Sequence, residues 1–304
     1  MPRLSLIVPF QRDAAALETT VVSILESRTQ EDELIIVHDG DYDDPYQLAC
    51  DEAVVLETER GASLAEQLNL AVRAACSPAV QVLLPGTTLQ AGWCDQAMEV
   101  LEDSDVHAVS MAYFDTDARH VVFGIDQAHI PHRQVATSAD QVAGPLLAGT
   151  LIRRRSLIKL GGWCERIPES LIDLELTLLM RSLSIDFEVI ESSNMQLSAA
   201  VRGPKCSAFE LGKGCGMLAC AYSELPDSHV TVEPLVRRIG QLASGLLNPK
   251  VAAERLGWVL GVRDRSWSQT IAERVELAGS AFHAAATIPL AKPESQPSVS
   301  RRAA

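Results

Sequence analysis

The segment Leu4-Ser5-Leu6-Ile7-Val8-Pro9-Phe10 predicts a β-strand that is buried on both faces. It is short and apolar, and polar residues follow it at once. Asp13 is suited to cap a helix that begins after this strand. Four apolar residues then recur at helical spacing along one face: Leu17, Val21, Ile24 and Leu25. The chain is therefore expected to open with a buried strand followed by an amphipathic helix.

The same alternation continues for about a hundred residues. Further strands are predicted at Leu34–Val37, Val54–Leu56 and Val80–Leu84. The helices between and after them are marked by Leu64, Leu68, Val72 and Ala75, and then by Trp93, Ala97 and Leu101. Short apolar strands alternating with helices predict an α/β fold, with a mostly parallel sheet flanked by helices. Because ligands of such sheets bind beyond the carboxyl ends of the strands, loops 9–13, 39–44 and 85–88 are the candidate site.

Composition narrows the class of protein. The 304 residues are 47% hydrophobic and 22% charged, which is typical of a globular protein, and the net charge is −14. Such an acidic chain is not expected to bind nucleic acid. Seven cysteines without a paired motif indicate reduced thiols. No signal peptide or membrane span is evident, so we expect a cytoplasmic protein and leave peripheral contact with the inner membrane face open.

The second half of the chain has a different pattern. Strands are expected at 107–114 and 120–125, joined by the turn 115–118, with another ending at Arg153 and a helix at Ser170–Leu183. We therefore divide the chain into an α/β domain at 1–204, with halves at 1–105 and 106–204, a helical region at 205–288 and a disordered tail at 289–304.

Four segments in this order resemble family 2 glycosyltransferases, which have the Rossmann-like GT-A fold. They are the opening strand through Gln11 and Arg12, the strand Glu33–Gly40, the helix Asn69–Ala75, and Gly161-Gly162-Trp163-Cys164-Glu165 followed by Asp173-Leu174-Glu175-Leu176. The resemblance covers about residues 3–195. It implies an inverting hexosyltransferase that moves a sugar from a nucleotide-diphosphate sugar to a hydroxyl of a glycan, lipid or protein.

The resemblance implies a set of nucleotide-sugar-binding residues: Pro9, Gln11, Asp39, Gly40, Asn69, Gly86 and Thr87. Asp39 matches the family acid that reads the edge of the base. A carboxylate suits this role because it only accepts hydrogen bonds and can receive a ring N–H. The alternative is a turn acid beside Gly40. Asp41, Asp43 and Asp44 are interpreted as a solvated turn, with a cation site as the alternative.

The loop Leu83-Leu84-Pro85-Gly86-Thr87-Thr88-Leu89 departs from the family pattern. The family places an Asp-x-Asp motif here that holds Mg²⁺ or Mn²⁺, and Pro85 and Thr87 stand in its place. A hard cation prefers carboxylate ligands, so we expect neither a metal site nor another cofactor. The backbone N–H groups of Gly86, Thr87 and Thr88 are an alternative phosphate site. Arg202 and Lys205 are candidates for neutralising the leaving diphosphate.

Asp173 falls where the family keeps its general base. An inverting transferase needs one carboxylate to take the proton of the acceptor hydroxyl. The alternative is an exposed helix acid, because Leu171, Leu174 and Leu178 would form the buried face. The sequence thus predicts a metal-independent glycosyltransferase. Two alternatives are a non-catalytic nucleotide-sugar-binding or scaffolding relative, and a chain whose helical region docks a partner or a membrane.

Overall fold

The first apolar segment forms β1 (Leu4–Pro9), a fully buried strand inside a seven-stranded sheet. The computed structural model describes residues 2–116, 120–127, 133–191, 193–197, 206–226, 230 and 248–286. The spatial order of the strands is β13 (Phe187–Ile190), β6 (Ala108–Met111), β12 (Thr150–Arg153), β4 (Ala79–Val82), β1, β2 (Asp32–His38) and β3 (Val54–Glu57). β12 runs antiparallel to both of its neighbours, and the other pairs are parallel. The predicted α/β fold with a mostly parallel sheet is therefore confirmed.

The helices of the first half begin and end close to where the sequence predicts. α1 (Ala14–Ser27) begins after Asp13, whose side chain accepts the N–H of Ala16 at 3.0 Å. α2 (Leu64–Ala74) begins with a capping box between Ser63 and Glu66. α3 (Asp95–Asp103) follows, and Trp93 lies in the turn before this helix rather than on it. The indole N–H of Trp93 donates to the buried Gln81 Oε1 at 3.1 Å, so the ring is part of the core next to β4.

Two strands predicted in the second half are each divided between two sheets. The first becomes β6 and β7 (Tyr113–Asp115), and the second becomes β8 (His120–Val122) and β9 (Gly124–Asp126). A four-stranded sheet has the order β5 (Thr87–Leu89), β14 (Met195–Leu197), β7, β8. A three-stranded sheet has the order β10 (Val135–Ala136), β9, β11 (Val142–Gly144). Hydrophobicity alone does not show these breaks, because the apolar run continues through them.

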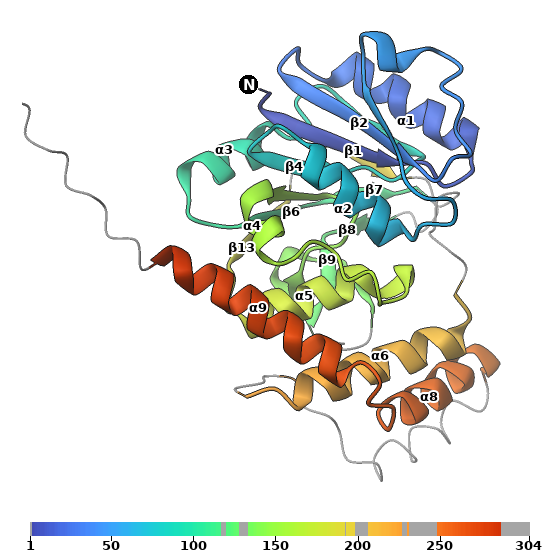
Figure 1. Cartoon of the computed structure of the whole chain (residues 1–304), viewed down its shortest axis with the longest axis vertical. Helices are drawn as coiled ribbons and strands as arrows, with labels where there is room; N and C mark the ends of the chain where they lie inside the picture. The colour runs from blue at the N-terminus through green and yellow to red at the C-terminus, as the bar shows by residue number, and fades with distance from the viewer. Residues whose placement is uncertain are drawn as a thin grey trace, which may run out of the picture.

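The rest of the described chain is mostly helical (Figure 1). Its helices are α4 (Arg154–Lys159), α5 (Ile172–Ser182), α6 (Ala208–Ser223), α8 (Pro249–Gly261) and α9 (Ser268–Ala286). Short 3₁₀ turns lie at η1 (Leu48–Cys50), η3 (Ala139–Gln141) and η4 (Glu169–Leu171), the last directly before α5. α6 and α8 lie side by side, and α9 runs back along α4 and the α5 region. Buried side chains of these helices belong to the same continuous core as the large sheet. None of the described helices is long and apolar enough to cross a membrane.

Glycines let α6 and α8 pack backbone against backbone. A Cβ on Gly212 would lie 1.9 Å from the carbonyl oxygen of Glu254, and one on Gly257 would lie 2.0 Å from that of Phe209. A Cβ on Gly261 would lie 2.0 Å from the Lys213 carbonyl oxygen. Any larger side chain would force the helices apart. The glycine-rich run at 212–216 is therefore a helix-packing surface.

Candidate functional site

The second strand delivers Asp39 to the carboxyl edge of the large sheet. Asp39 directly follows β2 and only 5% of its surface is exposed. Gly40 comes next with φ = +92°, a conformation that side-chain-bearing residues rarely adopt. The Gly40 N–H donates to His38 Nδ1 at 3.1 Å. Asp39 is thus held by the turn that Gly40 permits, and the buried His38 supports that turn.

Arg12 from the neighbouring loop covers one side of this acid. Its Nη2 lies 2.9 Å from Asp39 Oδ2, and its Nε lies 3.2 Å from Asp41 Oδ2. Burial alone would raise the pKa of Asp39, but the hydrogen bond and charge of Arg12 outweigh burial and hold this pKa below its ordinary value. Arg12 has φ = +64°, a strained conformation that its two ion pairs stabilise.

The second oxygen of Asp39 is buried, and the backbone N–H groups of Gly61 and Asp39 also help to hold the pKa of this acid below its ordinary value. Oδ1 is buried and makes no hydrogen bond of normal geometry with the described residues. A buried acceptor without a partner is costly. Pro9 ends β1 beside Val37 at this same edge, and the half-buried Gln11 follows it. The arrangement leaves one carboxylate oxygen able to accept an N–H from a ligand.

The acidic turn after Asp39 is organised by its own hydrogen bonds. Asp44 accepts the N–H groups of Leu48 at 2.8 Å and Ala49 at 3.0 Å. Asp41 is paired with Arg12 and, at 3.4 Å, with Arg60. Within the described ranges, no group of three or more His, Cys, Asp and Glu side chains is placed to hold a metal ion.

The loop at residues 85–88 differs from its predicted form. Residues 87–89 form β5, which pairs with β14, so this segment is a strand rather than an open turn. The Gly86 N–H donates to the Ala16 carbonyl at 2.9 Å and the Thr87 N–H to the Leu84 carbonyl at 3.0 Å. The buried Thr87 hydroxyl also donates to Leu84 O, at 2.6 Å. These donors of Gly86 and Thr87 are therefore used within the protein, and the phosphate-site interpretation of this loop is corrected.

Asn69 is also occupied by the protein. Its side-chain NH₂ donates to the carbonyl of Trp163 at 2.9 Å and to Glu165 Oε1 at 3.0 Å, and its Oδ1 accepts the Trp163 N–H at 2.8 Å. Asn69 is 6% exposed. Asn69 thus connects α2 to the Gly161–Glu165 segment, and these contacts give no support to its predicted role in binding the nucleotide sugar.

Asp173 lies in the first turn of α5 and is paired with an arginine that the sequence analysis missed. Arg133 Nε donates to Oδ1 at 2.9 Å and Nη2 to Oδ2 at 2.7 Å, while Oδ1 also accepts the Leu174 N–H at 2.8 Å. The charge of Asp173, opposed by burial, raises the pKa of Arg133. Asp173 is 3% exposed, so the alternative of an exposed helix acid is wrong.

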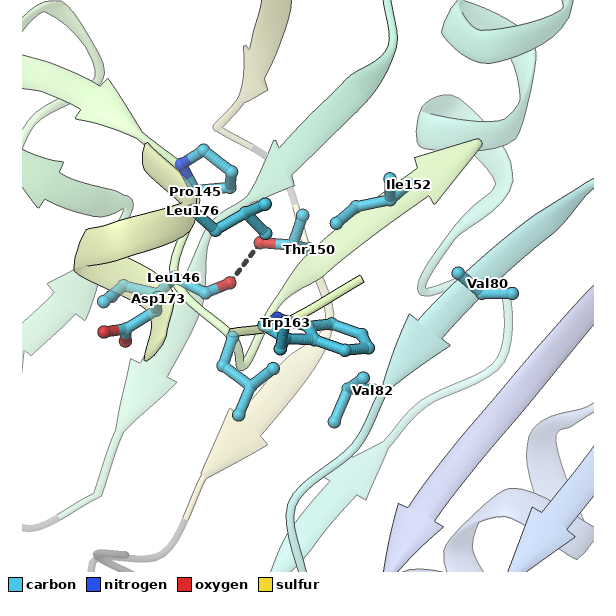
Figure 2. A pocket seen from close by; sticks show the side chains of 10 residues that line it. Val80, Val82, Pro145, Leu146, Thr150, Ile152, Trp163, Asp173 and Leu176 are labelled. Atoms are coloured by element: carbon cyan, nitrogen blue, oxygen red, sulfur yellow. Dashed lines mark hydrogen bonds between the residues drawn. The ribbon is translucent and has the colours of Figure 1, made fainter. Parts of the chain in front are cut away.

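Asp173 also borders a small apolar cavity (Figure 2). The cavity has a volume of ≈ 10 Å³, about the room of one water molecule. Val82 at the carboxyl end of β4 and Thr150 at the start of β12 line it as well. Figure 2 shows the Asp173 carboxylate pointing away from Val80 and Val82. The first turn of α5 thus borders a cavity that β4 and β12 also line, and the Asp173 carboxylate itself accepts hydrogen bonds from Arg133.

Glu175 forms a second buried ion pair on α5. Its side chain is fully buried, and its Oε1 receives Arg274 Nε from α9 at 2.9 Å and the Tyr222 hydroxyl from α6 at 3.1 Å. Arg274 also donates to the carbonyls of Gly161 and Gly162. Burial raises the pKa of Glu175, and Arg274 and Tyr222 partly oppose that rise. The network ties the helical region to the Gly-Gly-Trp segment.

Two of the predicted site residues, Arg202 and Lys205, lie outside the described residues. Sequence reasoning missed Arg133 and Arg274, which are isolated arginines with no motif around them. Their only signal was indirect: Asp173 and Glu175 stand in an otherwise apolar helix, and acids in such a position require a cationic partner.

A more open groove lies at the opposite edge of the large sheet. An open groove of ≈ 440 Å³ is lined by residues at the amino-terminal ends of β2 and β3, including Asp32, Glu33 and Val54. Ligands of parallel sheets bind at the opposite edge. The carboxyl-edge residues, and not this groove, therefore form the candidate site.

Comparison with solved structures agrees with this fold. A mannosyltransferase from Pyrobaculum calidifontis, solved in complex with GDP-Man and Mn²⁺, superposes with a TM-score of 0.52 and 16% sequence identity. The match covers 92% of this chain and 87% of that chain. The sequence matches no family model, and the curated proteins contain no match to it. The chain therefore has a glycosyltransferase-like α/β fold.

Proposed function

We propose that this protein is an inverting glycosyltransferase that moves a sugar from a nucleotide-diphosphate sugar to a hydroxyl acceptor without a metal ion. One observation carries the proposal: the buried Oδ1 of Asp39 at the carboxyl end of β2 makes no hydrogen bond of normal geometry with the described residues. An N–H on the edge of a nucleobase would satisfy this oxygen. The likeness in fold to a protein that binds GDP-Man supports the same choice of ligand.

Asp173 supplies the second part of the chemistry. As the acceptor oxygen bonds to the anomeric carbon, the bond from that carbon to the diphosphate oxygen breaks. The acceptor proton passes to the Asp173 carboxylate and then to solvent, and the nucleoside diphosphate leaves. Its position in the first turn of α5, beside a cavity that β4 also lines, supports this role. Hydrogen bonds and charges must stabilise the departing diphosphate.

Metal independence is the part of the proposal that depends on residue chemistry at the end of β4. The fold neighbour was solved with Mn²⁺. Here Pro85 offers no side-chain oxygen, and the Thr87 hydroxyl is buried and donates to a backbone carbonyl. Neither residue fits a hard divalent cation. Protein cations would then neutralise the diphosphate.

A binding-only relative is the second candidate, and the Arg133–Asp173 pair favours it. Both oxygens of this carboxylate are engaged by the guanidinium, so an acceptor hydroxyl would have to compete with Arg133 for them. A chain that keeps Asp39 but locks Asp173 would bind the donor without transferring the sugar. The two candidates share the nucleotide site and differ only in turnover.

Calorimetry with GDP, UDP and their sugars tests the shared site. Asp39→Ala should weaken binding by roughly tenfold or more, because losing a hydrogen bond to a charged acceptor costs about 1.5–3 kcal/mol. Asp43→Ala is the matched control, since Asp43 is an exposed acid of the same turn. Equal affinity of the folded Asp39 variant and wild type would remove Asp39 from the site.

Turnover separates the two candidates. Nucleoside diphosphate release, with acceptor or by slow hydrolysis, should fall about 10²–10⁴-fold in Asp173→Asn while donor binding persists. Full turnover in this variant would exclude Asp173 as the base. Donor binding by wild type without transfer or hydrolysis would favour the binding-only candidate.

A further inference from the structure

The ion pair on Asp173 blocks the base that the proposed function needs. Both carboxylate oxygens accept hydrogen bonds from Arg133, and Oδ1 accepts a third from the Leu174 N–H. These three hydrogen bonds occupy most of the acceptor positions of the carboxylate. An acceptor hydroxyl that is to donate to Asp173 must therefore compete with Arg133.

Arg133 is the outer member of the pair. Its side chain is 33% exposed, against 4% for Asp173. Among the residues that the structure describes, Asp173 is the carboxylate at ion-pair distance from Arg133. Arg133 is therefore the more accessible partner, and within the described ranges its printed side-chain contacts are those with Asp173.

The pair also lies toward the edge where a donor would bind. Asp173 borders the same small cavity as Val82, the last residue of β4, although its carboxylate points away from Val82 (Figure 2). Tyr113, just beyond the carboxyl end of β6, is close enough that the charges of Arg133 and Asp173 both act on its ionisation. Ligands of parallel sheets bind beyond these strand ends.

We propose that Arg133 exchanges partners: when the donor binds, the Arg133 guanidinium leaves Asp173 and binds the diphosphate of the donor. This exchange frees the Asp173 carboxylate to act as the base. The inference rests on the proposed function. Arginine binds phosphate with the same forked geometry as carboxylate, so one contact replaces the other. The transferred guanidinium then neutralises charge on the leaving diphosphate, a task that metal ions perform in other transferases.

Release of Arg133 has a cost that sets the order of binding. Asp173 would be left as a buried carboxylate without its cation, which is unfavourable. An acceptor hydroxyl that donates to the freed oxygen offsets part of this cost. The donor must therefore bind before the acceptor, and Asp173 becomes a base only when the donor is present.

Calorimetry with GDP and UDP tests the exchange, because it predicts that Asp173 competes with the diphosphate. Asp173→Asn should bind the nucleoside diphosphate about 3–10 times more tightly than wild type, since Arg133 loses its competing anion. Arg133→Gln should bind roughly tenfold more weakly, and adding Asp173→Asn to it should have no further effect. Asp140→Asn, which removes an exposed acid of equal charge, is the matched control. Guanosine and uridine, which lack phosphate, should not respond to Asp173→Asn.

The outcomes separate this inference from the proposed function. If wild type binds neither GDP nor UDP, the proposed function fails and the inference fails with it. If wild type binds but a folded Asp173→Asn binds equally or more weakly, only the exchange is overturned. A measurement on the wild-type protein tests the exchange even if the variants fail to fold. The ¹⁵N Nε–Hε signal of Arg133, assigned with Arg133→Lys, should shift on saturation with nucleoside diphosphate, and an unmoved signal also overturns the exchange.

Discussion

Replacing Arg274 by methionine tests how the helical region supports the candidate site. The substitution keeps the apolar stem of the side chain and removes the charge that faces Glu175. The Glu175 side chain is 0% exposed and that of Arg274 only 12%, so solvent cannot replace the lost partner. Glu175 Oε2 already lacks a hydrogen bond within the described structure. Only the Tyr222 hydroxyl would still donate to the carboxylate.

The expected loss follows from this isolation. Removing one member of a buried ion pair costs about 3–5 kcal/mol. At roughly 2–3 °C per kcal/mol, the melting temperature should fall by about 6–15 °C. Burial already raises the pKa of Glu175, and without Arg274 it rises further. A raised pKa means that the folded state holds a proton that the unfolded state has lost. The deficit of Arg274→Met should therefore be smaller near pH 5 and grow as pH rises toward 8.

Scanning calorimetry across this pH range, together with a double-mutant cycle, provides the assay. Glu175→Gln in the Arg274→Met background removes the isolated charge and should recover stability, with a coupling energy above about 1 kcal/mol. Arg263→Met is the matched control, because Arg263 is exposed near the end of α8. A deficit under about 1 kcal/mol, or one that does not change with pH, would refute the view that α9 anchors α5 through this pair.

Three further predictions concern the metal, the α6–α8 contact and Arg12. Nucleoside diphosphate binding should persist in excess EDTA with less than about a threefold change in Kd, and a requirement for Mn²⁺ would contradict the proposed metal independence. Gly257→Ala should destabilise the fold by about 1–2 kcal/mol because its Cβ would lie 2.0 Å from Phe209 O. Gly279→Ala is the control: its Cβ would lie 3.4 Å from Leu183 Cδ2, an ordinary contact, so the variant should be neutral or stabilising in thermal melts. Arg12→Gln should raise the pKa of Asp39, as read by ¹³C carboxylate NMR. Because the low pKa of Asp39 adds stability that is lost as pH falls, the stability gap between variant and wild type should close below about pH 4.

The elements of the first half could be predicted because each depends on local pattern. β1 and β2 are continuous apolar runs, and α1 and α2 begin at Asp13 and Ser63, whose side chains cap them. The order of strands and helices then requires a parallel sheet, and a parallel sheet places its ligands at one edge. The position of Asp39 at that edge followed from these facts alone.

The tertiary structure decided which hydrogen-bond and ion-pair partners the polar side chains of the site have. Arg12 pairs with Asp39 across 27 residues, Arg133 with Asp173 across 40, and Arg274 with Glu175 across 99. Residues 87–89, which overlap the loop predicted at 85–88, form a strand through their pairing with β14. Asn69 is used by the distant Trp163.

The reason is that a local sequence pattern determines whether the backbone forms a helix or a strand. The partner of a buried polar side chain, in contrast, comes from a distant segment and depends on the tertiary structure. By itself, the sequence determined the α/β alternation, the helix starts and the edge where Asp39 lies. It could not show that Asp173 and Glu175 are buried, since an acid in a helix is buried only when a cation from another segment neutralises it. Folding brought Arg133 and Arg274 to those acids, and that placement decided which groups of the site are free.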